Sequence, residues 1–169
     1  MSDIDLTQVV QESKSTLFIL CGLPYAGKSY VAKEIQKLNN IVYVAIDDIF
    51  REHGFDWDSN NLPDADAWEQ IFNESYEQTK KGLLEGKNVL YDSTNQTLAS
   101  RDRLREVAKS VDAEAKVIYI KSSTETVWKR WEENQKNPSR SVVSKELVQM
   151  TVDTFEEPAE REDAIIIRN

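Results

Sequence analysis

The segment GLPYAGKS at residues 22–29 constrains this chain more than any other, because it follows the apolar run TLFILC at 16–21. The residues after it, KSYVAKEIQKL, carry Val31, Ile35 and Leu38 at helical spacing. Residues 16–38 therefore predict a strand, a glycine-containing loop and a helix. In a chain of 169 residues we expect this unit to belong to a single domain over 1–169.

Further apolar runs predict four more strands, at 41–46, 87–92, 115–120 and 164–168. Helical patterns lie between them: a series from Trp68 to Leu83, a helix capped by Ser100, a capping box from Ser122 to Glu125, and a helix from Ser144 through Phe155. This alternation predicts a three-layer α/β/α sandwich around a mostly parallel five-stranded sheet. Residues 1–14 are expected to form a peripheral helix or a partly ordered tail.

The composition limits where the protein acts and what it binds. No apolar run is long enough to span a bilayer, and the N-terminus lacks a signal-peptide pattern. Cys21 is the single cysteine, so we expect a reducing, cytoplasmic location. A formal charge of −9 disfavours long nucleic acid as the main partner.

Residues 22–29 fit the pattern G-x-x-x-x-G-K-S, in which backbone N–H groups and a helix N-terminus converge on phosphate oxygens. Lys28 is expected to reach the β- and γ-phosphates of a nucleotide, and the Ser29 hydroxyl to complete a Mg²⁺ coordination sphere. The predicted cofactors are therefore ATP and Mg²⁺. The expected nucleotide-binding residues are Gly22, Leu23, Pro24, Tyr25, Ala26, Gly27, Lys28, Ser29 and Tyr30.

Tyr25 is unusual in this loop, where smaller or more polar residues are common. A positive φ angle at this position would strain a tyrosine. We expect its ring to lie outward, over the nucleotide or a lid.

The second predicted strand ends in IDDIFRE, with Asp48 and Arg51 three residues apart on the first turn of a helix. Asp48 is a candidate base for the proton of a substrate hydroxyl, and Arg51 is a candidate to hold that substrate or a phosphate oxygen. The alternative is a helix cap with a local ion pair. Asp47 is the better candidate for the cap, although a role as the base stays open.

The third predicted strand ends in YDSTN, where Asp92 is placed to orient water on Mg²⁺. Thr94 and Asn95 are candidates to bind substrate or the neighbouring loop. An Asx-type turn is the alternative reading of the same residues.

The segments GLPYAGKS, DDIFR and DSTN are followed by RDRLREVAK and by the distal WKRW, SRSVV and FEEP. With these segments, the chain resembles the polynucleotide-kinase-like group of P-loop kinases over about residues 16–160. The resemblance implies a P-loop NTPase fold with a lid at 130–143 and an acceptor-side insertion at 52–80. It implies that Asp48 is the base with Arg51 as its companion, and that Asp92, Thr94, Asn95 and Arg101 serve the site.

The family closes a lid whose arginines meet the transferred phosphoryl group, which implies roles for Arg130 and Arg140. A solvated or cation–π position is the alternative for Arg130. The lid sequence WEENQK carries acids in place of the basic cluster of polynucleotide kinases, so a nucleic-acid end is a weaker candidate for the acceptor.

From Glu52 to Thr79 the chain has eight acids and no Lys or Arg, which favours a neutral or cationic small acceptor. In this region we interpret Trp68, Phe72 and Tyr76 as packing residues rather than a base-stacking platform. His53, the only histidine, is interpreted as a loop or surface residue rather than a proton shuttle.

The favoured hypothesis is an ATP-dependent phosphotransferase that acts on a hydroxyl group and exists as a monomer or weak homo-oligomer. The alternative is a nucleotide-binding ATPase or switch module without a small-molecule acceptor. Acceptor-dependent release of ADP distinguishes the two.

Overall fold

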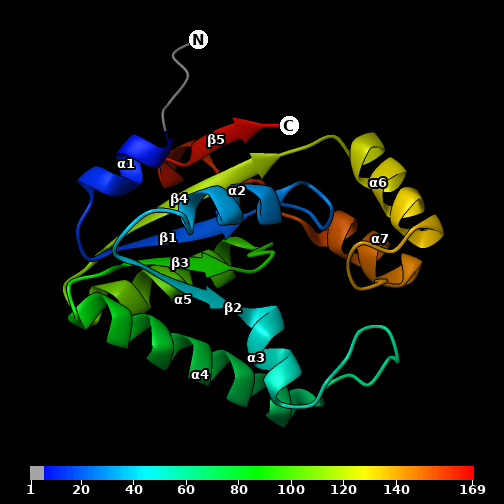
Figure 1. The fold of residues 1–169 in the computed structure, drawn as a ribbon, viewed down its shortest axis with the longest axis horizontal. Helices are drawn as coiled ribbons and strands as arrows, with labels where there is room; N and C mark the ends of the chain where they lie inside the picture. The colour runs from blue at the N-terminus through cyan, green and yellow to red at the C-terminus, as the bar shows by residue number, and fades with distance from the viewer. Residues whose placement is uncertain (1–5) are drawn as a thin grey trace.

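Five parallel strands form the centre of the molecule in a computed structural model that describes residues 6–169 (Figure 1). They are β1 (Thr16–Cys21), β2 (Ile41–Ala45), β3 (Asn88–Asp92), β4 (Glu114–Lys121) and β5 (Ile165–Arg168). Their order is β2-β3-β1-β4-β5, and every neighbouring pair is parallel. The predicted α/β sheet is confirmed, and all its carboxyl ends lie at one edge.

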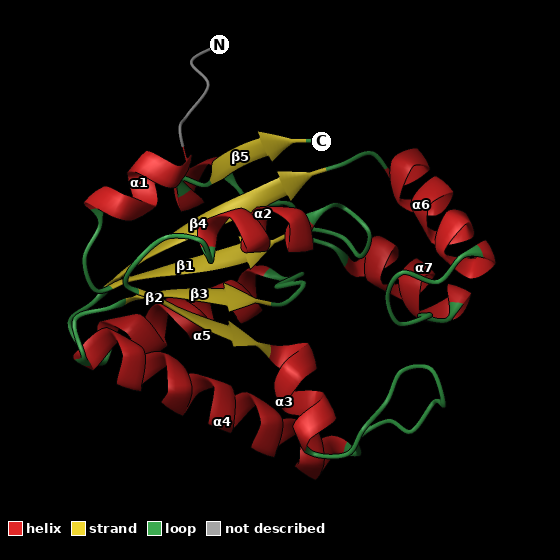
Figure 2. Cartoon of the chain, viewed as in Figure 1, coloured by secondary structure: helices red, strands yellow, loops and turns green. Residues whose placement is uncertain are grey.

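Helices cover both faces of this sheet (Figure 2). They are α1 (Leu6–Glu12), α2 (Lys28–Ile35), α3 (Ile46–Glu52), α4 (Ala65–Leu84), α5 (Leu98–Lys109), α6 (Thr124–Lys136) and α7 (Lys145–Thr154), with a 3₁₀ turn at Glu160–Glu162. α4 and α5 pack on one face, whereas α1 and α2 pack on the other. The predicted three layers are therefore present.

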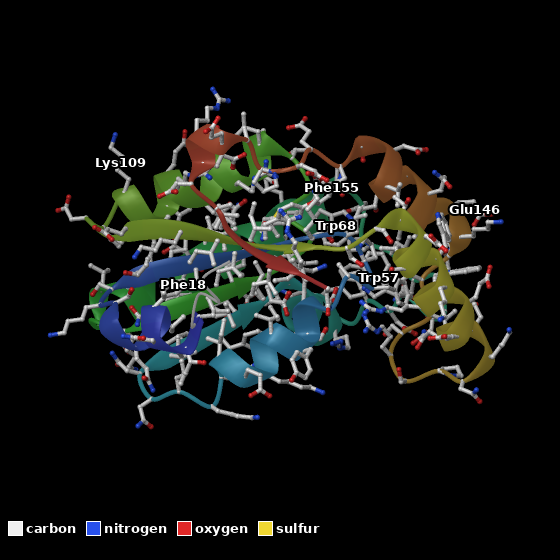
Figure 3. The ribbon with its side chains drawn as sticks, turned by 90° about the horizontal axis from the view of Figure 1, so that it is seen from above. Phe18, Trp57, Trp68, Lys109, Glu146 and Phe155 are labelled. Carbon is white, nitrogen blue, oxygen red and sulfur yellow. The ribbon has the colours of Figure 1, made fainter. Side chains whose placement is uncertain are left out.

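The central strand β1 is buried along its whole length, which explains its continuous apolar sequence. Leu17 and Ile19 face the α4 and α5 layer, and Phe18 and Leu20 face the α2 layer. Viewed from above, Phe18 lies inside the molecule while Lys109 lies at its surface (Figure 3). This core fixes the strand ends that carry the candidate site.

Two predicted helix caps are wrong by a few residues. The N-cap of α5 is Thr97, and Ser100 is the third helical residue, which completes a reciprocal capping box. The N-cap of α6 is Ser123, and its hydroxyl accepts a hydrogen bond from the Thr126 N–H. Because β4 extends to Lys121, the second of the two successive serines takes the capping position. Ser144 caps α7 as predicted.

The N-terminal segment is helical over Leu6–Glu12, as one of the two alternatives for residues 1–14 predicted. The part of that prediction covering residues 1–5 lies outside the described residues. Within 6–169, no helix combines the length and apolarity that crossing a membrane requires.

Candidate active site

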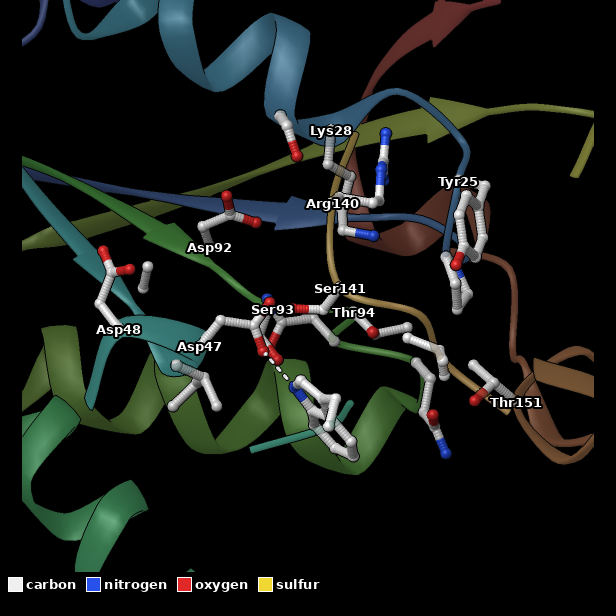
Figure 4. Close-up of a pocket in the computed structure, with 18 of the residues that line it drawn as sticks. Tyr25, Lys28, Asp47, Asp48, Asp92, Ser93, Thr94, Arg140, Ser141 and Thr151 are labelled. Atoms are coloured by element: carbon white, nitrogen blue, oxygen red, sulfur yellow. Dashed lines mark hydrogen bonds between the residues drawn. The ribbon is translucent and has the colours of Figure 1, made fainter. Parts of the chain in front are cut away.

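A cavity of about 1060 Å³ lies at the carboxyl edge of the sheet. Its walls come from the loop after β1, the start of α3, the loop after β3, and the connector at 137–144 between α6 and α7. In Figure 4, Lys28 and Arg140 lie on one side, Asp47 and Asp48 lie on the other, and Asp92 lies between them. Ligands of open α/β sheets bind at this edge.

The loop at 22–29 has the backbone geometry that phosphate binding requires. Gly22 has φ +156°, and a Cβ atom there would come within 2.8 Å of the Ile120 carbonyl oxygen. Gly27 has φ +108° and is the N-cap residue of α2. The first turn of α2 therefore presents N–H groups without intrahelical partners at the cavity, together with the positive end of the helix dipole.

Lys28 and Asp92 form the charged centre of the cavity. The Lys28 ammonium donates to the carbonyl oxygens of Gly22 (2.8 Å) and Leu23 (3.0 Å), and burial lowers the pKa of this lysine. Burial raises the pKa of Asp92, while nearby Lys28 and a 2.6 Å hydrogen bond from the Tyr43 hydroxyl oppose that rise. Each charge thus favours the ionised state of the other.

Tyr25 adopts the left-handed conformation, with φ +61°. A left-handed conformation costs a non-glycine residue about 1–2 kcal/mol. The residue is only 3% exposed and belongs to a buried apolar cluster, so its ring is not turned out to solvent as expected. The ring does line the cavity and faces Arg140 of the predicted lid, which agrees with the other part of the prediction. Its hydroxyl has no hydrogen-bond partner among residues 6–169.

The two candidate lid arginines both contact the phosphate loop. Arg130, on α6, donates through Nη1 to the carbonyl oxygens of Tyr25 (3.0 Å) and Ala26 (3.2 Å). Arg140 lies in the 137–144 connector, with its guanidinium carbon 4.9 Å from the centre of the Tyr25 ring. Its charge also contributes to the lowered pKa of Lys28. Arg140 therefore lies closer to the expected phosphate position, whereas Arg130 holds the outside of the loop.

Asp48 and Arg51 form an exposed ion pair of 3.2 Å on α3, and both line the cavity. Asp47 also lines it, but its proposed role as helix cap is wrong. The N-cap residue is Ala45, and the Asp47 carboxylate instead accepts a hydrogen bond from the Trp57 indole N–H at 3.2 Å. This bond is the dashed line in Figure 4.

The loop after β3 attaches to the phosphate loop. The Gly22 N–H donates to the Thr94 carbonyl oxygen at 3.2 Å, and the Asn95 side-chain amide donates to the Leu20 carbonyl oxygen at 2.6 Å. Asn95 is buried and has φ +46°. Both residues line the cavity, but the Asn95 amide group already bonds the end of β1.

The structure does not support the expected substrate contact of Arg101. Its side chain has no exposed surface and pairs through two nitrogens with Glu162, at 2.8 Å each. Its remaining terminal nitrogen donates to the Asn95 carbonyl oxygen at 2.9 Å and to that of Glu156 at 3.0 Å. Arg101 therefore supports the loop after β3 from behind.

An aromatic wall, formed by Trp57, Trp68 and Phe72, closes the acceptor side of the cavity. Phe50 stacks on Trp57 at 4.6 Å between ring centres, and Trp68 lies 5.8 Å from Phe72. The expected packing role is confirmed for Trp68, although the same ring also faces the cavity. His53 is exposed and bonded to Glu74 at 2.8 Å.

Three contacts of the site were not predicted from the sequence. Tyr43 bonds Asp92 across neighbouring strands, and Asn169 donates to the Ala26 carbonyl oxygen at 2.9 Å. The Asp58 carboxylate accepts from the Val142 N–H at 2.6 Å, which joins the acceptor side to the connector. The only sequence signal for any of them was the position of Tyr43 near the end of the predicted strand at 41–46.

The cavity offers oxygen ligands that suit Mg²⁺. Ser29 and Asp92 both line it, and each supplies a hard oxygen atom. No group of three or more His, Cys, Asp or Glu side chains in the described part of the chain could hold a metal by itself. A nucleotide-bound Mg²⁺ does not need one, because water and phosphate oxygens fill most of its coordination sphere.

The fold is that of the P-loop NTPases, with a glycine-containing loop and a lysine opposite carboxylates at the end of a parallel sheet. The family model described as "Chromatin associated protein KTI12" matches residues 16–164, and the chain belongs to that family.

The chain is also similar to individual proteins of known sequence or structure. L-seryl-tRNA(Sec) kinase of Methanococcus maripaludis is 31% identical over 134 residues, which cover 75% of this chain and 49% of that protein. The chain thus spans about half the length of this curated relative. A chain of the Pnkp1/Rnl/Hen1 RNA repair complex has a TM-score of 0.70 at 23% identity, over 82% of this chain and 43% of the other.

Kti12 of Chaetomium thermophilum in complex with ADP-AlF3 has a TM-score of 0.64 at 20% identity, over 90% and 88% of the two chains. At these identities the two structural similarities establish the fold only.

Proposed function

We propose that this protein is an ATP-dependent kinase that phosphorylates a hydroxyl group of a small acceptor. The observation that carries the proposal is the convergence of Lys28, Asp48 and Asp92 on one cavity at the end of the phosphate loop. The seryl-tRNA(Sec) kinase similarity supports phosphoryl transfer in general, and the net charge of −9 argues against long nucleic acid.

In the proposed reaction the acceptor hydroxyl oxygen attacks the γ-phosphorus of ATP. A bond forms between these atoms while the bond from the γ-phosphorus to the bridging oxygen breaks, and ADP leaves with the electron pair. The hydroxyl proton passes to the Asp48 carboxylate. Arg51 orients that carboxylate through their 3.2 Å ion pair.

The loop residues hold the nucleotide. N–H groups at the start of α2 bind the phosphates, and Lys28 exchanges the carbonyl oxygens of Gly22 and Leu23 for β- and γ-phosphate oxygens. Arg140 neutralises charge on the transferred group. Ser29 would ligate Mg²⁺ and Asp92 would orient its water, and the ion would neutralise phosphate charge when bound.

The test is transfer of labelled phosphate from γ-labelled ATP to a pool of cell metabolites, followed by identification of the product. The wild-type protein is expected to label one or a few compounds, and Asp48→Asn is the control that retains ATP binding. The proposal fails if the wild-type protein labels nothing, or if the Asp48 variant labels the same compounds at the same rate.

A nucleotide-dependent switch is the second candidate, because the chain belongs to the KTI12 family and resembles a Kti12 that binds ADP-AlF3. In that case Asp48 is a structural ion-pair partner. Slow release of ADP that no metabolite stimulates would favour the switch over the kinase.

A further inference from the structure

The two ends of the cavity differ in chemistry. Lys28 and Arg140 give the phosphate end a positive charge. At the acceptor end the cation Arg51 already pairs with Asp48, whereas Asp47 accepts only from the neutral indole of Trp57 among the described contacts. Between residues 52 and 79 the cavity is lined by Trp57, Trp68 and Phe72, and this segment includes no Lys or Arg. The acceptor end therefore presents one carboxylate, that of Asp47, without a cationic partner among the described contacts.

The aromatic wall stands beside these carboxylates. Trp57 and Trp68 lie 6.2 Å apart between ring centres and are only partly covered, and Phe72 is 36% exposed. Phe50 lies behind them with no exposed surface, so the wall is supported from the core. Indole faces attract cations, and aromatic rings also pack against apolar groups.

We propose that the acceptor is an amino alcohol, whose protonated amine lies between the Asp47 carboxylate and the aromatic wall while its hydroxyl faces Asp48. This inference rests on the proposed kinase function. An anionic acceptor, such as a sugar acid or a nucleic-acid 5′ end, would face repulsion from Asp47.

A hydrogen bond links the two segments beside the aromatic wall. The Asp58 carboxylate holds the Val142 N–H at 2.6 Å, which links the acceptor side to the 137–144 connector. This hydrogen bond joins two segments that flank the cavity. The aromatic wall itself would pack against an apolar or aromatic body of the proposed acceptor.

The test uses three matched alcohols that share a phenyl ring and a benzylic hydroxyl: 2-amino-1-phenylethanol, 1-phenylethane-1,2-diol and mandelate. Their affinities are measured by calorimetry on the full chain saturated with a non-hydrolysable ATP analogue and Mg²⁺. The cationic compound is expected to bind about tenfold more tightly than the neutral diol, and mandelate is expected to bind most weakly.

Two variants test whether Asp47 and the aromatic wall produce this preference for the amine. Asp47→Asn is expected to remove most of the preference for the amine while leaving the diol affinity within about twofold, and Trp57→Leu is expected to weaken both compounds. Asp66→Asn, an exposed acid at the start of α4 outside the cavity lining, is the matched control and should change neither.

The inference is overturned if the three compounds bind equally, if none binds, or if Asp47→Asn and Asp66→Asn behave alike. These results leave the kinase proposal standing as long as the analogue itself binds in a Lys28-dependent manner. If the analogue does not bind to the wild-type protein, the kinase proposal fails, and this inference fails with it.

Discussion

Replacing Glu162 by Gln removes the counter-charge of Arg101, which is fully buried behind the loop after β3. Glu162 is 3% exposed at its side chain, and it accepts from two nitrogens of Arg101 and, at 2.7 Å, from Arg105. Burial would raise the pKa of Glu162, but hydrogen bonds from the two arginines outweigh it and lower that pKa to about 2.

The size of the effect follows from this pKa. Relative to the ordinary value of 4.5, a folded-state pKa of about 2 corresponds to about 3 kcal/mol of stability at neutral pH. Loss of one partner from a buried pair gives a similar cost, about 3–5 kcal/mol. For a domain of this size, we expect Glu162→Gln to lower the melting temperature by roughly 6–12 °C.

The pH dependence has a definite sign. Because the folded-state pKa is lowered, the stabilisation is complete above about pH 4.5 and is lost as the pH falls toward 2. The assay is urea unfolding at several pH values. As the pH falls through this window, the free energy of unfolding should decrease less for the variant than for the wild type.

A matched control is Glu106→Gln, which breaks the exposed 3.3 Å pair with Arg103 and should cost less than about 1 kcal/mol. The reasoning is refuted if the Glu162 and Glu106 variants have equal stability at pH 7.

Three further substitutions test the site. Lys28→Ala should abolish the increase in melting temperature that ATP·Mg²⁺ gives the wild type, and an unchanged increase would argue against nucleotide binding by this loop. Asp48→Asn should retain ATP binding and lower the phosphorylation rate by about 10²–10⁴-fold, whereas near-normal turnover would remove this residue as the base. Tyr25→Phe keeps the ring and removes a buried hydroxyl that has no hydrogen-bond partner. The variant's free energy of unfolding should therefore be the same as that of the wild type or higher by up to about 1 kcal/mol. A clear loss of stability in urea would mean that the hydroxyl has a partner.

The strands could be predicted because burial on both faces makes each central strand an uninterrupted apolar run. The phosphate loop could be predicted for a related reason: glycines at 22 and 27 are required by a close carbonyl and by a left-handed backbone. Asp47, Asp48 and Asp92 were placed near one another because parallel strands end at the same edge of the sheet.

Contacts between distant segments could not be predicted in this way. Arg101 stands in a charged, helical stretch that resembles a solvated face, and its partner Glu162 lies 61 residues further along the chain. The Tyr25 ring is buried because it joins an apolar cluster built from distant segments and because Arg140 of the 137–144 connector lies over it, and the local sequence pattern indicates neither contact. Trp57 was missed as a cavity residue because no periodic pattern surrounds it.

The most direct test of the nucleotide site is a crystal structure with a non-hydrolysable ATP analogue and Mg²⁺. We predict that the β- and γ-phosphates lie against the N–H groups at the start of α2. The Lys28 ammonium should leave the carbonyl oxygens of Gly22 and Leu23 and bind phosphate oxygen. A bound analogue with its phosphates elsewhere, and with both of those lysine bonds intact, would contradict the proposed function.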